Sequence, residues 1–359
     1  KFSPVTNPPS DSLREQSRMS LKTRFGNLRD VLDSNSYQDN VFVMDSPIIT
    51  NSIFSKMMKF GQNVTKIIDC SFDLKKTSLK ETIRRIQSEA EAAVLSGKQH
   101  VVLTDINTDH DKVSAPIILA TAAVHTFLTR KGIRSFVSIH TQSAECLDTH
   151  YFAVLIGVGA TTVNPYLAQE CIRERYEKGL FKNLSYEECV QRYKKAVDQG
   201  LLKVMAKLGI SVLSAYRGGF NFEALGLSRS MVNEYFLGVQ SRISGIGLTG
   251  IEFKINQLHS YAYSGDVDTL PIGGIYRYRY GEETHAYDGK LIHLLQTAVS
   301  NDSYDLYKKY SLAHKNFSPI NIRDLLEFKS IKEKKSLSDV ESITSIRNRF
   351  GSGSMSHGA

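Results

Sequence analysis

The sequence lacks the features that mark membrane, secreted and disulfide-rich proteins. In 359 residues, no apolar run approaches the ~20 residues needed to cross a bilayer, so no membrane span is predicted. The first twenty residues are polar and include Pro4, Pro8 and Pro9, a composition that predicts no secretory signal. The chain has four cysteines and no Cys-x-x-Cys pair, which excludes zinc ribbons and thioredoxin-type chemistry. We expect Cys70, Cys146, Cys171 and Cys189 to be small apolar residues in a reducing compartment.

Motifs for catalysis and phosphate binding are also missing. Gly157-Val-Gly-Ala160 fits neither a dinucleotide fingerprint nor a P-loop, because no Gly-Lys-Ser/Thr follows. There is no nucleophile elbow, no His-Glu-x-x-His and no paired-carboxylate motif. His285, His293 and His314 are spaced too widely to predict a metal site. Taken alone, the residues predict a soluble domain without a self-sufficient active site.

The charge balance is basic but diffuse. Forty-five Lys and Arg stand against 37 Asp and Glu, a formal net charge of +8, with the densest basic block at Lys329–Lys335. A spread excess of this kind favours solubility and weak steering of acidic partners. The run Tyr276–Tyr280 alternates Tyr and Arg and could stack on bases and contact phosphates. An edge strand with one aromatic face is the interpretation we prefer, and we predict no nucleic-acid partner.

From residue 41 to 215, short β-branched runs alternate with longer amphipathic stretches. The predicted strands are Val64–Cys70, His100–Leu103, Ser135–His140, Ala160–Val163 and Ile210–Leu213. The predicted helices are Leu79–Ser96 with Ser78 as N-cap, Ala115–Arg130, Glu145–Ile156, one beginning at Pro165, and Tyr186–Leu208. Strands joined by helices need crossover connections, so the sheet should be parallel. Pattern alone leaves two architectures open: a doubly wound sheet and part of a (β/α)8 barrel.

Beyond residue 215 the alternation stops. Residues 216–250 are rich in glycine around a predicted helix at Ser230–Phe236. Short helices are predicted at Lys290–Val299 and Tyr304–Tyr310, and Lys329–Ile346 is charged and typical of a linker or exposed helix. We therefore expect an irregular, glycine-rich C-terminal part.

Polar residues follow several predicted strands. In parallel α/β proteins, ligands bind at the carboxyl ends of the strands. Asp105, His140 and Asn164 stand at such positions, and Arg217 follows the last predicted strand after Ser214. Local turn formation explains short polar residues there equally well. Tyr216–Gly219 could bind an anion through backbone N–H groups, although a tight turn is the simpler interpretation.

Short sequence motifs of one known family occur in chain order over nearly the whole length. They include Pro4–Pro9, Leu13–Glu15, Met19–Leu21, Val124–His125, Arg130–Gly132, His150–Phe152, Leu155–Gly157, Val163–Leu167, Gly200–Lys203, Gly209–Ser211, Tyr216–Gly218, Phe222–Ala224, Ser241–Ile243, Gly245–Gly247, His293–Leu295, Tyr307–Tyr310, Arg323–Leu326, Met355–Ser356 and Gly358–Ala359. With these motifs the sequence resembles the central domain of glutamate synthase. The resemblance implies an incomplete (β/α) barrel-like parallel sheet with flanking helices. It also implies three segments: an extension from an amidotransferase domain at residues 1–40, the central domain at 41–330, and a linker into an FMN-binding barrel at 331–359.

Enzymes of this family pass ammonia from an amidotransferase domain through an internal tunnel to a barrel with FMN and an iron–sulfur cluster. There 2-oxoglutarate is aminated and reduced to glutamate. The resemblance implies that this chain joins the two active parts and helps line the tunnel, without catalysis of its own. None of its cysteines matches a nucleophile or a cluster ligand. Met355, Ser356, Gly358 and Ala359 resemble a loop whose backbone touches the flavin, where small residues allow close approach. Without the rest of the barrel we expect neither FMN nor a cluster on this chain.

The chain starts at Lys1 and ends at Ala359 in a Gly-rich turn, so we expect a fragment of a longer polypeptide. Its partners would be the other domains of that polypeptide and an electron donor, either ferredoxin or an NAD(P)H-linked small subunit. The family implies bacterial cytoplasm or plastid. We expect Asp105, His140, Asn164 and Arg217 to face a partner domain or the tunnel. The alternative is a stand-alone, non-catalytic scaffold derived from this domain, which should show polar replacements on its formerly covered surfaces.

Overall fold

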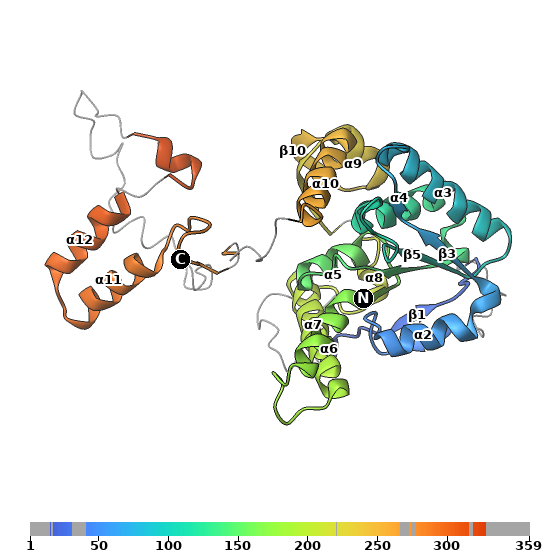
Figure 1. The fold of residues 1–359 in the computed structure, drawn as a ribbon, viewed down its shortest axis with the longest axis horizontal. Coiled ribbons are helices and arrows are strands. Elements are labelled where there is room, and N and C mark those ends of the chain that lie inside the picture. The colour runs from blue at the N-terminus through green and yellow to red at the C-terminus, as the bar shows by residue number, and fades with distance from the viewer. Residues whose placement is uncertain are drawn as a thin grey trace. The chain divides into compact units, whose positions relative to one another are not determined.

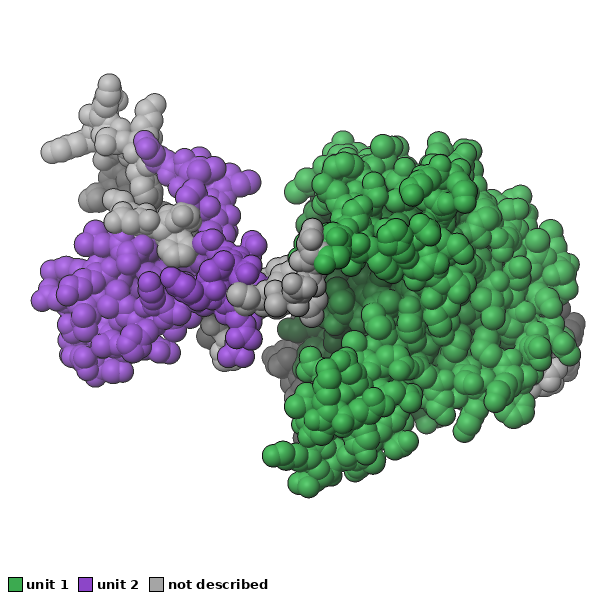
Figure 2. All heavy atoms as spheres, in the orientation of Figure 1, with its two compact units in different colours: residues 1–267 green, residues 268–359 purple. Residues whose placement is uncertain are grey.

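The computed structural model describes residues 15, 17–30, 41–219, 221–265, 273–274, 277–315 and 319–327. The chain divides into two compact units, residues 1–267 and 268–359 (Figure 2). The first unit contains the parallel sheet and all four strand-end candidates. The flavin-loop candidates Met355, Ser356, Gly358 and Ala359 lie outside the described residues, as does the predicted linker Lys329–Ile346.

Four parallel strands form the centre of the first unit: β3 (Thr65–Asp69), β5 (His100–Thr104), β7 (Ser138–Gln142) and β8 (Thr162–Asn164). Their order in the sheet, β3-β5-β7-β8, is also their order in the chain. A doubly wound sheet reverses its strand order at a switch point, and this sheet does not. With right-handed crossovers, an unreversed order places every connecting helix on one face, as in a barrel. The predicted α/β class is confirmed, and the sheet corresponds to part of a barrel.

The connecting helices are α3 (Leu79–Leu95), α4 (Ile117–Arg130) and α5 (Thr149–Gly157) (Figure 1). Alternate strand residues, among them Ile68, Val101, Leu103 and Ile139, share one buried apolar cluster with these helices. Leu79, Ile83, Ile86 and Ala90 supply the matching face of α3 at helical spacing. Since these strand residues alternate with others on the opposite side of the sheet, the helices cover one face only.

Local signals set the helix ends. The Ser78 hydroxyl accepts from the Glu81 N–H while the Glu81 carboxylate accepts from the Ser78 N–H, which confirms Ser78 as the N-cap of α3. The same reciprocal pair, Ser185 and Glu188, begins α7 (Tyr186–Leu208), whose bounds match the prediction. Gly209 ends α7 at φ +71°, a left-handed conformation that suits glycine. α6 (Tyr166–Glu177) follows Pro165 as expected.

The second face of the sheet is polar and is covered by the N-terminal part of the chain. Its side chains include His100, Val102 and His140, and above them lie β1 (Thr23–Phe25) and β2 (Phe42–Met44). Helix α2 (Asn51–Phe60) adds Phe54, which packs in a small cluster with Ile49 and Val102. In place of the remaining strands of a closed barrel, a two-stranded antiparallel ribbon and one helix cover this face.

The first unit contains further short elements beside the parallel sheet and its helices. They are the antiparallel strands β4 (Ser71–Phe72) and β6 (Val113–Ser114), the short 3-10 helices η1 (Gln62–Val64) and η2 (Arg134–Phe136), α8 (Leu213–Tyr216), α9 (Arg229–Tyr235), α10 (Leu248–Ala262), and the parallel strands β9 (Glu223–Leu227) and β10 (Gln240–Ile246). The sequence analysis missed β9 and β10. A Cβ on Gly245 would lie 2.1 Å from the Gly226 carbonyl oxygen, so close backbone packing explains the local glycine content.

Three predicted strands are corrected by the structure. Ile210–Leu213 adds no strand to the parallel sheet; Val212 forms an isolated bridge with Ser20, and Leu213 begins α8. The first half of Ser135–His140 is η2, and β7 begins only at Ser138. Of the segment Tyr276–Tyr280, residues 277–280 are described and form no strand. Short apolar or aromatic runs of this kind become strands only where tertiary packing supplies a partner strand, which the sequence pattern does not show.

In the second unit, α11 (Gly289–Ser300) packs on α12 (Tyr304–Lys315), and the 3-10 helix η3 (Ile322–Leu325) follows. Both helices were predicted, and α12 continues beyond the predicted end at Tyr310. Among the described residues of the chain, no helix is long and apolar enough to span a membrane.

Candidate functional site

The four candidate residues do not gather into one site. Asp105 follows β5 and Asn164 is the last residue of β8, so both lie at the carboxyl edge of the sheet. His140 lies in the middle of β7 and pairs with Val102 of β5, so its predicted place at a strand end is wrong. Arg217 borders a cavity together with Ser138, the first residue of β7, and therefore lies at the amino edge.

Asp105 joins the loops after two strands. Its carboxylate accepts from the Ser143 hydroxyl at 2.6 Å and from the Ala144 N–H at 2.9 Å. The side chain is 3% exposed, and this burial raises the pKa of the Asp105 carboxyl, although its hydrogen bonds act in the opposite direction. Asp105 therefore has the contacts of a structural residue that holds the loop after β7 against the loop after β5.

Asn164 ties the carboxyl end of β8 to the N-terminal segment. Its Nδ2 donates to the Ile49 carbonyl at 3.1 Å and to Asn51 Oδ1 at 2.9 Å. Within the described part of the chain, its buried Oδ1 has no hydrogen-bond partner. A groove of about 480 Å³ lies beyond Asn51 and Gln169, and its arginine, Arg173, is paired with Glu170 at 3.2 Å.

His140 belongs to a buried pair of histidines on the polar face. His140 Nε2 lies 3.0 Å from His100 Nδ1, and His140 Nδ1 lies 2.7 Å from the Thr162 hydroxyl. The edge of Phe25 packs on His140 with ring centroids 5.4 Å apart. Burial lowers the pKa of His100 to about 4, and burial and neighbouring positive charge lower the pKa of His140 well below its usual value. At neutral pH both rings are neutral, and one nitrogen of the pair donates to the other.

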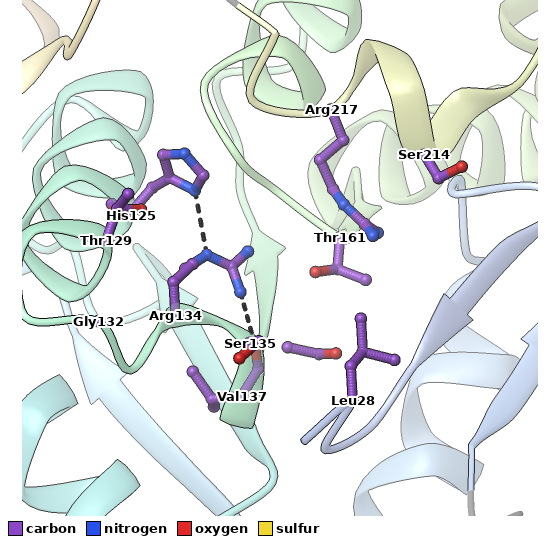
Figure 3. Close-up of a pocket in the computed structure, with 11 residues that line it drawn as sticks. Leu28, His125, Thr129, Gly132, Arg134, Ser135, Val137, Thr161, Ser214 and Arg217 are labelled. Atoms are coloured by element: carbon purple, nitrogen blue, oxygen red, sulfur yellow. Dashed lines mark hydrogen bonds between the residues drawn. The ribbon is translucent and has the colours of Figure 1, made fainter. Parts of the chain in front are cut away.

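The amino edge contains a different arrangement, a cavity of about 380 Å³ into which two arginines reach (Figure 3). Arg134 comes from η2 and is fixed by three donated bonds, to His125 Nδ1 at 3.0 Å, the Val137 carbonyl at 2.6 Å and the Gly159 carbonyl at 2.8 Å. Arg217 enters from the turn after α8, and no described residue accepts a hydrogen bond from its guanidinium or pairs with it. Burial, then Arg217, lowers the pKa of Arg134 to about 9.

His125 supports this cavity from α4. Cβ atoms placed on Gly159 and Gly218 would lie 2.3 Å and 2.9 Å from its ring, so two glycines leave the space that the imidazole fills. Because Arg134 donates to Nδ1, that nitrogen must be unprotonated. Burial, with Arg134 and Arg217 nearby, lowers the pKa of His125 to about 3, which keeps the ring neutral. The sequence analysis missed His125 and Arg134, since neither follows a strand.

A second cavity of about 450 Å³ adjoins the first and shares Leu28, Ser214 and Arg217 with it. It adds Lys22 and Arg24 from the N-terminal segment. No Asp or Glu lines either cavity among the residues that the structure describes. The two cavities therefore form one basic region at the amino edge of β7 and β8.

Metal and thiol chemistry find no support within the described ranges. No group of His, Cys, Asp and Glu there could hold a metal ion. Cys70, Cys146 and Cys189 are buried, as expected, whereas Cys171 is exposed. Burial raises the pKa of the Cys70 and Cys146 thiols, so neither is a reactive thiolate at neutral pH.

Comparison with known families shows to which family the chain belongs. Residues 1–228 match the family described as the glutamate synthase central domain. Residues 285–359 match a conserved region in glutamate synthase. The chain belongs to the glutamate synthase family. The resemblance noted in the sequence is thereby confirmed.

The relatives are much longer than this chain. A glutamate synthase [NADPH] large chain of Azospirillum brasilense is 51% identical over 360 residues, covering 100% of this chain and 24% of the relative. The corresponding chain of Bacillus subtilis (strain 168) is 36% identical, and a ferredoxin-dependent glutamate synthase of Pyropia yezoensis is 35% identical, each with the same coverage. The chain thus spans about a quarter of the length of these glutamate synthases.

Among solved structures, the recombinant flavin-binding domain of baker's yeast flavocytochrome b2 is 12% identical, with a TM-score of 0.32. The match covers 55% of this chain and 40% of that one. A likeness at this level supports no statement about cofactor or activity in the glutamate synthase segment.

Proposed function

We propose that this chain is the segment of a glutamate synthase that joins the amidotransferase and synthase parts and lines the passage of ammonia between them. The proposal rests on the extent of the sequence match. The whole of this chain aligns with about a quarter of each much longer glutamate synthase chain. The activity of the complete enzyme, the formation of L-glutamate from L-glutamine and 2-oxoglutarate with a reductant, belongs to the whole polypeptide. This segment contributes to that oxidoreductase without catalysing the reaction alone.

The ionisation of the candidate residues supports a passage for a neutral molecule. Burial raises the pKa of Asp105 and lowers that of His140, so both are shifted toward their uncharged forms. Together with Asn164 and Arg217, these residues extend from the amino edge across the polar face to the carboxyl edge. A wall that passes ammonia has to avoid trapping it as ammonium beside a fixed negative charge. We propose a tunnel or domain-interface role for all four.

Exposed apolar side chains favour an embedded segment over the stand-alone scaffold. Leu312 of α12 is 60% exposed, and Ile322 and Leu326 in and after η3 are 84% and 71% exposed. A scaffold adapted to solvent would replace such residues by polar ones. We propose that other domains of the same polypeptide cover them.

The remaining assignments follow from the family. We propose FMN and an iron–sulfur cluster in the intact enzyme, with Met355, Ser356, Gly358 and Ala359 near the flavin and no cofactor on this chain alone. The electron donor is ferredoxin or an NAD(P)H-linked subunit, and the compartment is the bacterial cytoplasm or a plastid. We keep the boundaries 1–40, 41–330 and 331–359 as the proposed division of the chain.

The test uses a complete glutamate synthase that contains this segment. Asp105, His140, Asn164 and Arg217 are replaced by Ala one at a time, and glutamine hydrolysed is compared with glutamate formed. We expect at least one variant to hydrolyse more glutamine than it converts, while Asp111→Ala, at an exposed site, stays coupled. Asp105→Asn and Arg217→Gln serve where an Ala variant does not fold. Full coupling in every folded variant would contradict the tunnel role.

A further inference from the structure

We propose that the basic region at the amino edge, built from Arg134, Arg217, Lys22 and Arg24, binds a small oxyanion with at least two negative charges. The ligand chemistry is that of inorganic phosphate or a short dicarboxylate. Arg217 is shared with the proposed tunnel or domain-interface role, but the test of anion binding uses the chain alone and measures no coupling of activities, so either proposal can fail without the other.

The first observation is uncompensated charge. Two guanidiniums border one cavity, and no carboxylate lines it or the adjoining one among the described residues. Like charges in a partly buried space repel each other, and Arg217 lowers the pKa of Arg134. Buried charges in proteins are normally paired, so an arrangement with two cations and no anion lacks its counter-charge.

The second observation is unused hydrogen-bonding capacity. A guanidinium has five N–H donors, and within the described ranges those of Arg217 meet no acceptor. Ser135 and Ser214 border the same cavity. Arginine forms paired, charge-assisted bonds to carboxylate and phosphate oxygens, so these groups match an oxyanion in geometry as well as charge.

The third observation is preorganisation. Arg134 is fixed by three bonds, and its partner His125 is enclosed by Gly159 and Gly218. Because the nearby imidazole is neutral, the positive charge resides on the guanidiniums. Cavities of about 380 and 450 Å³ are within the size range of small-ligand sites and exceed what a phosphate needs.

Arg173 is an arginine beside another cavity whose positive charge is paired within the protein. It pairs with Glu170 at 3.2 Å and lies over the Tyr186 ring at 4.9 Å. Its charge and donors are therefore used within the protein. Arg173→Gln removes the same charge as Arg217→Gln and serves as the control.

The experiment titrates the full chain with potassium phosphate and, separately, with potassium succinate, at constant ionic strength set with KCl. Calorimetry gives the affinity, and thermal unfolding gives the midpoint. We expect at least one anion to raise the midpoint by roughly 2–3 °C at tenfold excess over its Kd. Arg217→Gln should weaken binding by about 10- to 100-fold, because it loses a charged donor pair, while Arg173→Gln binds like the parent. A response to phosphate alone assigns a tetrahedral anion, and a response to succinate alone assigns a dicarboxylate.

A second variant tests the same site by adding a negative charge instead of removing a positive one. Ser214→Glu puts a tethered carboxylate at the border of both cavities. We expect it to unfold at a higher temperature than the parent without added anion, and to lose the response to phosphate and succinate. No response of the parent to either anion would overturn the proposal, as would an equal response in the parent and in folded Arg217→Gln.

Discussion

The two edges of the parallel sheet differ in charge and in how their polar groups are used. At the carboxyl edge, Asp105 accepts bonds from Ser143 and Ala144, and Asn164 donates to Ile49 and Asn51. At the amino edge, Arg217 meets no partner among the described residues, and the cavity beside it contains no acid there. In parallel α/β proteins the carboxyl edge is the usual ligand side. In this domain, the polar side chains of the carboxyl edge are hydrogen-bonded to neighbouring residues, and the positive charge without a partner lies at the amino edge.

The difference shows why strand-end position is an incomplete guide. A polar residue after a strand predicts a site only if its bonds are not consumed by the neighbouring loops. Here the loop after β7 uses the carboxylate of Asp105, and the segment at the start of α2 uses the side-chain amide of Asn164, so both side chains find partners within the chain. The following predictions alter one edge at a time, and they run from the largest expected effect to the smallest.

The largest loss of stability is expected from Gly159→Ala, which disturbs the packing of His125 beside the cavity at the amino edge. Gly159 has φ +117°, and its Cβ would lie 2.3 Å from His125 Nδ1, so strain and overlap add. We expect a loss of about 3–5 kcal/mol in the free energy of unfolding, measured by denaturant titration. The matched control is Gly132→Ala, with φ +72° and open space around its Cβ, which should lose only about 1 kcal/mol. Equal losses in the two variants would show that the enclosure of His125 contributes nothing.

At the carboxyl edge, Asp105→Ala removes the hydrogen bonds that join the loops after β5 and β7. This change leaves the Ser143 hydroxyl and the Ala144 N–H without their acceptor in a buried place. The expected loss is about 2–4 kcal/mol in the free energy of unfolding. Asp111, an exposed carboxylate on the following loop, is the control, and its replacement by Ala should change stability by less than about 0.5 kcal/mol. If Asp105→Ala is as mild as its control, the edge is not held by this residue.

The histidines of the polar face, together with His125 of α4, predict that the stability of the fold depends on pH. His100 and His125 have folded-state pKa values of about 4 and 3, against about 6.5 for an unfolded histidine. Below pH 6.5 the unfolded chain takes up protons that the folded one refuses, so stability falls as pH falls from 6.5 toward 4. Each buried histidine contributes at most about 1.4 kcal/mol per pH unit. Raised pKa values at Asp105 and Glu145 act in the opposite direction at the acid end of this window.

Unfolding midpoints at half-unit pH steps check this dependence. His100→Gln should reduce the slope by about a third, because one of the three histidines with a lowered pKa is gone. Stability that is flat between pH 6.5 and 4.5 would contradict the neutral histidine pair.

The smallest effect is expected at Arg217. Since its guanidinium has no partner among the described residues, Arg217→Gln should change stability by less than about 0.5 kcal/mol in chloride buffer. Arg134→Gln removes three hydrogen bonds and should cost about 2–4 kcal/mol. Chemical denaturation of both variants side by side separates the binding arginine from the supporting one. Similar losses would mean that both are structural.

Sequence patterns predicted the repeating βα units well, because period and capping are local. Ser78 and Ser185 mark helix starts, and Gly209 marks an end, through chemistry within a few residues. The order of the strands required the structure, since both barrel and doubly wound sheets share the same alternation. His125 and Arg134 were missed because their roles depend on glycines that are distant in sequence. Of the sequence motifs, Tyr216–Gly219 came closest to indicating the basic region. The sequence suggested anion binding through its backbone N–H groups, whereas the proposed site uses the side chain of Arg217.

The most direct measurement of the contrast between the edges is a phosphate titration of the isotopically labelled chain, followed by NMR. The account predicts shifts in the Arg217 Nε–H signal and in the backbone amides of Ser135, Ser138 and Thr161, which border the cavity. The amides of Asp105, Ser143 and Ala144 should stay unmoved at the carboxyl edge. Shifts centred on those three residues, or none at the amino edge, would contradict it.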